Sequence, residues 1–330
     1  MEEHTEENKE SNENKEESTY QPEKTPFLKK LRKSYIRNYK KLLIIPNLII
    51  LLAVIQIIFQ VSTTGDFLIK GVSLKGGISL TVPTDQDIDI DQLKMSLLET
   101  YPETDISIRT LSSRGNPIGF SVSADIEATN DDLVNEFIEE TKKHTNLDFQ
   151  KGEYTLESIG SSLGESFFRE TFRSIILAFI FMGIVVMLYF RKLIPAGIVI
   201  LAVVSDIIAT LAVINILGIK LSTGGIAAFL MLIGYSVDTD MLLTTNMIKR
   251  KDKSQQERIL SALKTGLLMT VTTLIAISVG LIFSQSEVIR QIMTILLVGL
   301  IMDLIFTWFQ NMGILRLYLE KKESKVEDEL

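Results

Sequence analysis

Residues 232–245, LIGYSVDTDMLLTT, place two aspartates in the middle of a run that is otherwise apolar enough to cross a membrane. The surrounding run, residues 224–248, covers about 37 Å as a helix, whereas a hydrocarbon core is about 30 Å thick. An ionised aspartate near the midplane costs about 2.5 to 3.5 kcal/mol. Asp238 and Asp240 therefore require either a protein interior or a water-filled path.

These two acids cannot serve the same partner from one straight helix, because residues two apart point about 200° from each other. We expect one carboxylate to act, or the helix to be broken between them. A polar stripe at i, i+4 and i+8 consists of Ser236, Asp240 and Thr244. Asp238 lies on another side with Gly234 and Tyr235, and we expect it to face a neighbouring helix.

The composition excludes several classes of site. The 330 residues include no cysteine and only two histidines, so disulfides, thiolate sites and cysteine nucleophiles are excluded and a zinc site is unsupported. We expect His4 and His144 to be solvated. No GxxxxGK[ST] motif is present, so we predict neither a nucleotide site nor any metal or cofactor, and no enzymatic activity.

The chain divides by composition into five parts. We expect a disordered acidic tail (1–28), a basic flank and first transmembrane helix (29–62), a domain outside the membrane (63–168), a five-helix transmembrane bundle (169–317) and a charged tail (318–330). A signal peptide is the competing interpretation of the apolar run 42–61. Its hydrophobic part would be shorter and followed by a small-residue cleavage site.

Five further spans are predicted at 174–190, 193–217, 224–248, 259–283 and 288–315. Arg191, Lys192 and the basic stretch 249–258 fall on the same side as the basic amino-terminal flank. The positive-inside rule therefore predicts a multi-pass cell-membrane protein with both termini in the cytoplasm and residues 63–168 outside.

Residues 63–168 read as alternating strands and amphipathic helices. Strands are predicted at 78–82, 105–111, 118–124 and 153–159, and helices at 91–101 and 131–144, the second capped by Asn130 or Asp131. This β-α-β-β-α-β order is the ferredoxin-like pattern. The segment holds 19 Asp and Glu against 8 Lys and Arg, which argues against nucleic-acid binding.

Two more aspartates, Asp206 and Asp303, lie near the middle of the third and sixth spans, and no lysine or arginine lies at similar depth. We therefore expect several of the four acids to be protonated at neutral pH. Their expected use is a proton or cation relay. Simple hydrogen bonding between helices is the alternative. Small and hydroxyl residues on one face of the fifth span, Gly266, Thr270, Thr273 and Gly280, favour helix packing.

Four motifs in this order resemble the SecF family of the resistance-nodulation-division superfamily. They are KGVSLKGGISL (70–80, with Gly76 and Gly77), SIGSSLGESF (158–167), SD (205–206) and LIGYSVDTD (232–240). Bacterial members usually read GYSxNDT where this chain reads GYSVDTD. The family's acidic position then falls on Thr239, between Asp238 and Asp240, and the pattern is more similar to the archaeal branch.

The resemblance implies an accessory subunit of the Sec translocase that works with SecD, a SecYE-type translocon and secreted client proteins, driven by the proton motive force. A passive scaffold subunit and half of a small-molecule or lipid exporter remain as alternatives. A lone bundle with four midspan acids leaves polar surface that lipid cannot satisfy. We therefore expect the face carrying Asp240 to pack against SecD, together with the small-residue face of the fifth span.

Overall fold

The computed structural model describes residues 38–113, 116–249, 254–284 and 286–328. The predicted acidic tail, His4 and most of the basic flank lie outside these ranges. From Lys40 onward the chain forms one compact unit. Its helices and strands are α3 (Tyr39–Leu42), α4 (Ile44–Thr64), α5 (Val72–Lys75), β1 (Gly77–Pro83), α6 (Ile90–Thr100), β2 (Ile106–Ser113), β3 (Asn116–Ala124), α7 (Asp131–Thr145), β4 (Thr155–Ile159), α8 (Ser161–Phe190), α9 (Leu193–Ile216), α10 (Thr223–Ile248), α11 (Gln255–Phe283), α12 (Glu287–Ile305), η1 (Phe306–Asn311) and α13 (Met312–Asp328).

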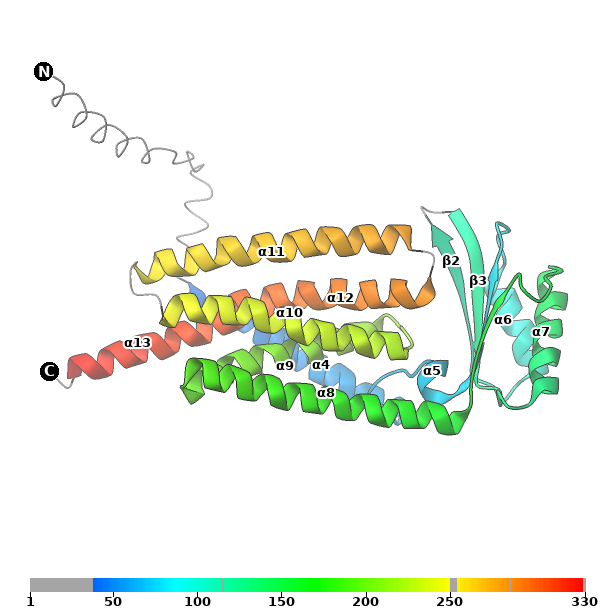
Figure 1. The fold of residues 1–330 in the computed structure, drawn as a ribbon, viewed down its shortest axis with the longest axis horizontal. Coiled ribbons are helices and arrows are strands. Elements are labelled where there is room, and N and C mark those ends of the chain that lie inside the picture. Colours follow the sequence, from blue (N-terminus) through cyan, green and yellow to red (C-terminus); the bar gives the residue numbers. More distant parts are fainter. Residues whose placement is uncertain (1–37, 114–115, 250–253, 285, 329–330) are drawn as a thin grey trace, which may run out of the picture. The chain divides into compact units, whose positions relative to one another are not determined.

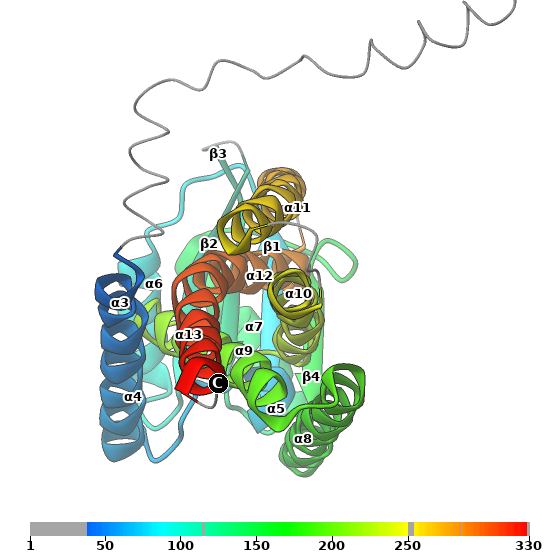
Figure 2. The ribbon, with the colours of Figure 1, turned by 90° about the vertical axis from the view of Figure 1, so that its left-hand side faces the viewer.

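Six helices among the described residues are long and apolar enough to cross a membrane, as the sequence predicts. They are α4, α8, α9, α10, α11 and the continuous α12-η1-α13 (Figure 1). In the most apolar stretch of each span, about half of the residues are buried in α9, α10 and the last span, whereas at most 17% are buried in α4, α8 and α11. Figure 2 shows α4, α8 and α11 at the outside of the bundle. The protein is thus a multi-pass membrane protein in which three of the six candidate spans are packed inside the bundle.

The segment between the first two spans folds into the predicted ferredoxin-like domain, named here the sheet domain. Its four strands are antiparallel in the order β2-β3-β1-β4. α6 and α7 cover one face of the sheet (Figure 1), and the core between them is built on Leu80, Phe120, Leu97 and Phe137, each at most 1% exposed. Strand alternation therefore leaves Ser79, Thr81 and Ser123 on the opposite, hydroxyl-lined face.

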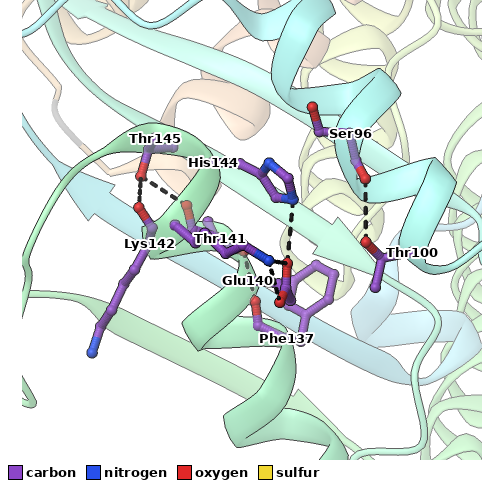
Figure 3. Close-up of polar contacts among 9 residues, drawn as sticks. Ser96, Thr100, Phe137, Glu140, Thr141, Lys142, His144 and Thr145 are labelled. Carbon is purple, nitrogen blue, oxygen red and sulfur yellow. Dashed lines mark hydrogen bonds and ion pairs between the residues drawn. The ribbon is translucent and has the colours of Figure 1, made fainter.

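The two helices of the sheet domain start at side-chain caps. Asp89 accepts hydrogen bonds from the backbone of Asp91 and Gln92, and Asn130 accepts one from Leu133, so Asn130 is the cap of α7. At the other end of α7, His144 is only 26% exposed and its Nε2 lies 3.2 Å from Glu140 (Figure 3). The expectation of a solvated histidine is therefore wrong, because the last turn of α7 keeps this side chain against the domain.

A short stretch, residues 65–76 and named here the connector, joins α4 to the sheet domain. It ends at Gly76, and Gly77 begins β1; the φ angles of these two glycines are 93° and 123°. A Cβ on Gly77 would lie 2.4 Å from the backbone oxygen of Ala124, and one on Gly164 would lie 2.7 Å from the nitrogen of Gly76. The glycine motif thus lets β1, β3 and the start of α8 approach closely. α8 begins at Ser161 rather than near residue 174, because hydropathy detects only its apolar part.

Candidate intramembrane acid site

The site lies along the contact between α10 and α12. Glycines make this contact close at both helices, since a Cβ on Gly224 would lie 2.6 Å from Val288 and one on Gly299 would lie 2.5 Å from Leu232. Such small residues let backbones approach within a membrane. The helices then bring Thr239 against Asp303 one to two turns farther along. α10 is continuous through this region, so the second of the two alternatives, a break between the aspartates, does not occur.

Three of the four midspan acids converge here, and each of them is fully buried. Asp206 on α9, Asp240 on α10 and Asp303 on α12 have 0% exposure. None of the ion pairs within the described ranges involves any of them. Like charges at close range in a dry interior disfavour simultaneous ionisation. The arrangement therefore favours states in which some of these carboxyls carry protons.

Hydroxyl and amide groups join the three acids. Ser236 donates to Asp206, and Thr239 lies 3.1 Å from both oxygens of Asp303. The Thr307 hydroxyl lies 2.8 Å from Oδ1 of Asp240 and 3.1 Å from Oδ1 of Asp303. A hydroxyl has one proton to donate. If Thr307 donates to one of these acids, the other must be protonated to keep its hydrogen bond.

Asp240 has a second, permanent donor. The amide nitrogen of Asn311 lies 2.6 Å from Asp240 Oδ1, and the amide of Gln310 reaches Ser205 on α9 at 3.2 Å. Both residues belong to η1, a π-helical turn that widens the last span just after Asp303. Such turns occur frequently at functional sites. Neither η1 nor these two amides was predicted from the sequence, although the pair Gln-Asn inside an apolar span was a visible signal.

Several oxygens of the cluster receive no hydrogen bond from the described residues. They are Asp206 Oδ1, Asp240 Oδ2, Thr210 Oγ1 and Thr244 Oγ1. Leaving a buried polar atom unpaired costs about 1 to 3 kcal/mol. Two of these atoms are carboxyl oxygens, which can take up a proton in place. The predicted stripe of Ser236, Asp240 and Thr244 is thus wholly buried, but only its first two members bond to other helices.

Asp238 has the opposite environment from Asp240. It is exposed on the bundle surface, on the same side of α10 as the exposed residues Met231, Gly234 and Tyr235. These four residues are named here the Asp238 face. The expectation that the Asp240 side of the helix is free for another subunit is wrong, because α12 and η1 of the same chain close it. Among the midspan aspartates that the structure describes, Asp238 is the one left on an open surface.

The predicted packing face of the fifth span is also occupied from within the chain. A Cβ on Gly266 would lie 2.3 Å from the Trp308 ring, and Trp308 is 3% exposed. Thr270 is buried and bonds the backbone of Gly266, whereas Thr273 is half-buried and bonds that of Met269. Gly266 therefore leaves the space that Trp308 of η1 occupies. Contrary to the expectation, this face of the fifth span is not available to SecD. In the described part of the chain, no three His, Cys, Asp or Glu side chains are arranged so that they could hold a metal ion.

Comparison with known proteins decides the family. The family model described as "Protein export membrane protein SecD/SecF, C-terminal" matches residues 138–321. The chain belongs to the SecD/SecF family. Among curated SecF proteins, that of Methanocaldococcus jannaschii is 37% identical over 88% of this chain and 99% of its own length. The SecF protein of Pyrococcus furiosus is 38% identical over 87% of this chain and 93% of its own length.

A solved structure agrees with the fold of this SecD/SecF-family chain. The crystal structure of SecDF, described as a translocon-associated membrane protein, from Thermus thermophilus superposes with a TM-score of 0.66 at 18% identity. The match covers 86% of this chain but 38% of the solved one. This chain therefore has the architecture of one part of that larger protein.

Proposed function

We propose that this chain is a SecF-type accessory subunit that acts with SecD to assist protein export, and that the proton motive force drives it. One observation carries the proposal: three midspan carboxyls on three helices are fully buried, two of them share the Thr307 hydroxyl, and the third accepts from Ser236 on α10. None of the three forms an ion pair with a described residue. Such groups are costly in a membrane, and for that reason an acid kept there is by default a candidate for ion or proton transfer. A proton crossing a potential of 100 mV supplies about 2.3 kcal/mol.

The proton-carrying groups in this proposal are Asp240, Asp303 and Asp206. The Thr307 hydroxyl can turn between Asp240 and Asp303 and so pass a proton between them without moving the backbone, whereas the Thr239 hydroxyl turns between Asp303 and the backbone oxygen of Ser236. Charging or neutralising an acid changes which contacts between α10 and α12 are favourable. A proton can shift the helix arrangement only by this difference in affinity between states.

We place the sheet domain outside the cell and both termini in the cytoplasm, following the distribution of basic residues. We place SecD on the Asp238 face, because an exposed midspan carboxylate facing lipid would be costly and a partner helix could supply its donor. A SecYE-type translocon and secreted chains are the remaining partners in this proposal.

The test uses the chain reconstituted with SecD in vesicles that carry a proton gradient. Asparagine keeps the volume and the hydrogen bonds of a neutral acid but removes its charged state. Asp240→Asn with Asp303→Asn should leave the complex intact and abolish the part of export that an uncoupler inhibits. Glu165→Gln, at an exposed acid of α8, is the control and should behave like wild type.

Two results would contradict the proposal. Wild-type export and uncoupler response in the double variant would support a passive scaffold. Photo-crosslinkers placed in the sheet domain that capture lipids or small molecules but no secreted chain would support an exporter.

A further inference from the structure

Gln291 on α12 holds the loop between α9 and α10, residues 217–222. Its Nε2 donates to the backbone oxygen of Lys220, and its Oε1 accepts from the backbone nitrogen of Ser222 at 3.2 Å and from the Ser222 hydroxyl. Ser222 is also the amino-terminal cap of α10, since its hydroxyl accepts from Gly225. One amide side chain therefore fixes α12 to the first turn of α10.

The opposite side of this loop is hydrogen-bonded to the connector. Leu221 donates to the oxygen of Ile69 and accepts from the nitrogen of Gly71, both at 2.7 Å, as in a two-residue parallel strand pair. Thr223 donates to the hydroxyl of Ser73 at 3.1 Å. The loop and the connector are thus joined by backbone bonds and have to move together.

Two ion pairs continue the connection into the sheet domain. Lys220 Nζ on the loop lies 3.3 Å from Asp105, which precedes β2, and Lys75 Nζ at the end of the connector lies 2.7 Å from Asp125, which follows β3. Asp125 also accepts from the backbone of Asp105 at 2.8 Å. Exposed ion pairs add little to the free energy of folding. These two pairs nevertheless constrain the direction in which the sheet domain leaves the bundle.

The same two helices carry the acid site. Gln291 precedes Asp303 by 12 residues on α12, about 18 Å along the axis. Between these positions Gly299 packs against Leu232 of α10, whose side chain lies 2.5 Å from where a Cβ on Gly299 would be, so the two helices are in close contact. A shift of α12 along α10 at the acid site therefore displaces Gln291 relative to Ser222, and the loop has to follow or lose its bonds.

We propose that Gln291 is a coupling residue, which transmits relative movement of α10 and α12 through the α9–α10 loop and the connector to the sheet domain. The inference rests on the proposed function, because protonation at the acid site supplies the movement. It assigns to Gln291 a positioning role at a distance from the acids and not a part in proton transfer.

The first experiment measures proton uptake and gradient-driven export by SecD complexes in vesicles. Gln291→Leu should retain proton uptake while export falls to its level without a gradient. Gln291→Glu, which keeps the acceptor for Ser222 and loses the donor to Lys220, should fall in between. Thr294→Val is the matched control, because the hydrogen bond that the Thr294 hydroxyl makes among the described residues, to the backbone oxygen of Arg290, stays within its own helix. Export that stays uncoupler-sensitive in Gln291→Leu would overturn the inference, as would equal losses of uptake and export.

The second experiment needs no gradient, so its failure is separable from failure of the proposed function. Hydrogen exchange at the amides of Leu221 and Gly71 is measured in the complex with and without Asp303→Asn. We expect the substitution to change both exchange rates when Gln291 is present and to leave them unchanged in Gln291→Leu. The same change in both backgrounds, or no change in either, would contradict coupling through this residue.

Discussion

The hydroxyl of Thr239 on α10 lies 3.1 Å from each carboxyl oxygen of Asp303 on α12. The same hydroxyl lies 3.0 Å from the backbone oxygen of Ser236, which can only accept. When the Thr239 proton points to Ser236, Asp303 must be protonated to keep its bond to Thr239. The orientation of one hydroxyl is thereby tied to the protonation of the facing acid, across the contact between two helices.

Replacing Thr239 by valine should remove this dependence at nearly constant volume. We expect Thr239→Val to lose about 1 to 3 kcal/mol of stability, because Asp303 loses a buried partner, and to lose its gradient response in export. Recovery of the complex with SecD should be unchanged. Thr244→Val is the control, since the Thr244 hydroxyl has no partner among the described residues and its removal should be neutral or stabilising. Equal stability and equal gradient response of export in the two variants would contradict this role for Thr239.

The Asp238 face predicts a different class of effect. Asp238→Leu should weaken copurification with SecD while leaving the isolated chain as stable as wild type, because the side chain is exposed within this chain. Asp238→Asn, which can still hydrogen-bond across an interface, should copurify nearly as well as wild type. Leu268→Ala, at a 64% exposed apolar position of α11, controls for a simple loss of surface. A destabilised monomer with normal SecD binding would be the contrary result.

The proposed topology can be checked directly because the chain has no cysteine. A cysteine introduced by Asn146→Cys should react with an impermeant thiol reagent added to intact cells. One introduced by Ser254→Cys should react only after lysis. Both positions are exposed, so accessibility is matched. Labelling of Ser254→Cys in intact cells would contradict the proposed orientation and indicate the reverse one.

The pair Lys75 and Asp125 predicts a pH dependence of stability. The hydrogen bond to Asp125 raises the pKa of Lys75 above its ordinary value. Burial raises the pKa of Asp125, but the hydrogen bonds from Lys75 and from the backbone of Asp105 outweigh burial and hold that pKa below its ordinary value. The Asp125 contribution is therefore present above its unfolded pKa and is lost as pH falls through the lower folded one. The Lys75 contribution is present below pH 10.5 and is lost as pH rises through the raised folded pKa.

Lys75→Gln should therefore flatten both limbs of a plot of thermal stability against pH, by less than about 1 kcal/mol because the lysine is half-exposed. Lys94→Gln, at an exposed position of α6, is the control and should leave the profile unchanged. An unaltered profile in Lys75→Gln would show that the pair adds nothing to folding.

Hydropathy and strand alternation were sufficient to predict six spans and the ferredoxin-like order of the sheet domain, because both patterns are local. The helical period also placed Asp238 and Asp240 on different sides of α10. It could not tell which side is buried, since that depends on where α12 packs. The glycines at 224, 225 and 299 that determine this packing are individually ordinary in a membrane helix.

The convergence of Asp206, Asp240 and Asp303 could not be predicted from the sequence for the same reason. Three midspan acids on three helices are visible in the chain, but their mutual distance depends on the order in which the helices pack. Asn311 and Gln310 reach the cluster because η1 widens the helix, and no periodic pattern records that extra residue. Gln291 is a single polar residue near a span end, where polar residues are common.

The π-helical turn at Phe306–Asn311 also affects how relatives of this chain should be aligned. One residue of an α-helix corresponds to about 100° of rotation, whereas the wider π turn holds one residue more in nearly the same total rotation. A homologue with one residue fewer here would close the turn to ordinary α-helix and keep the same side of α13 toward the bundle, with the counterpart of Gly313 still beside Leu43, whose side chain lies 2.7 Å from where a Cβ on Gly313 would be. A one-residue gap between this chain and such a homologue therefore belongs inside the turn, and the residues on either side of it correspond.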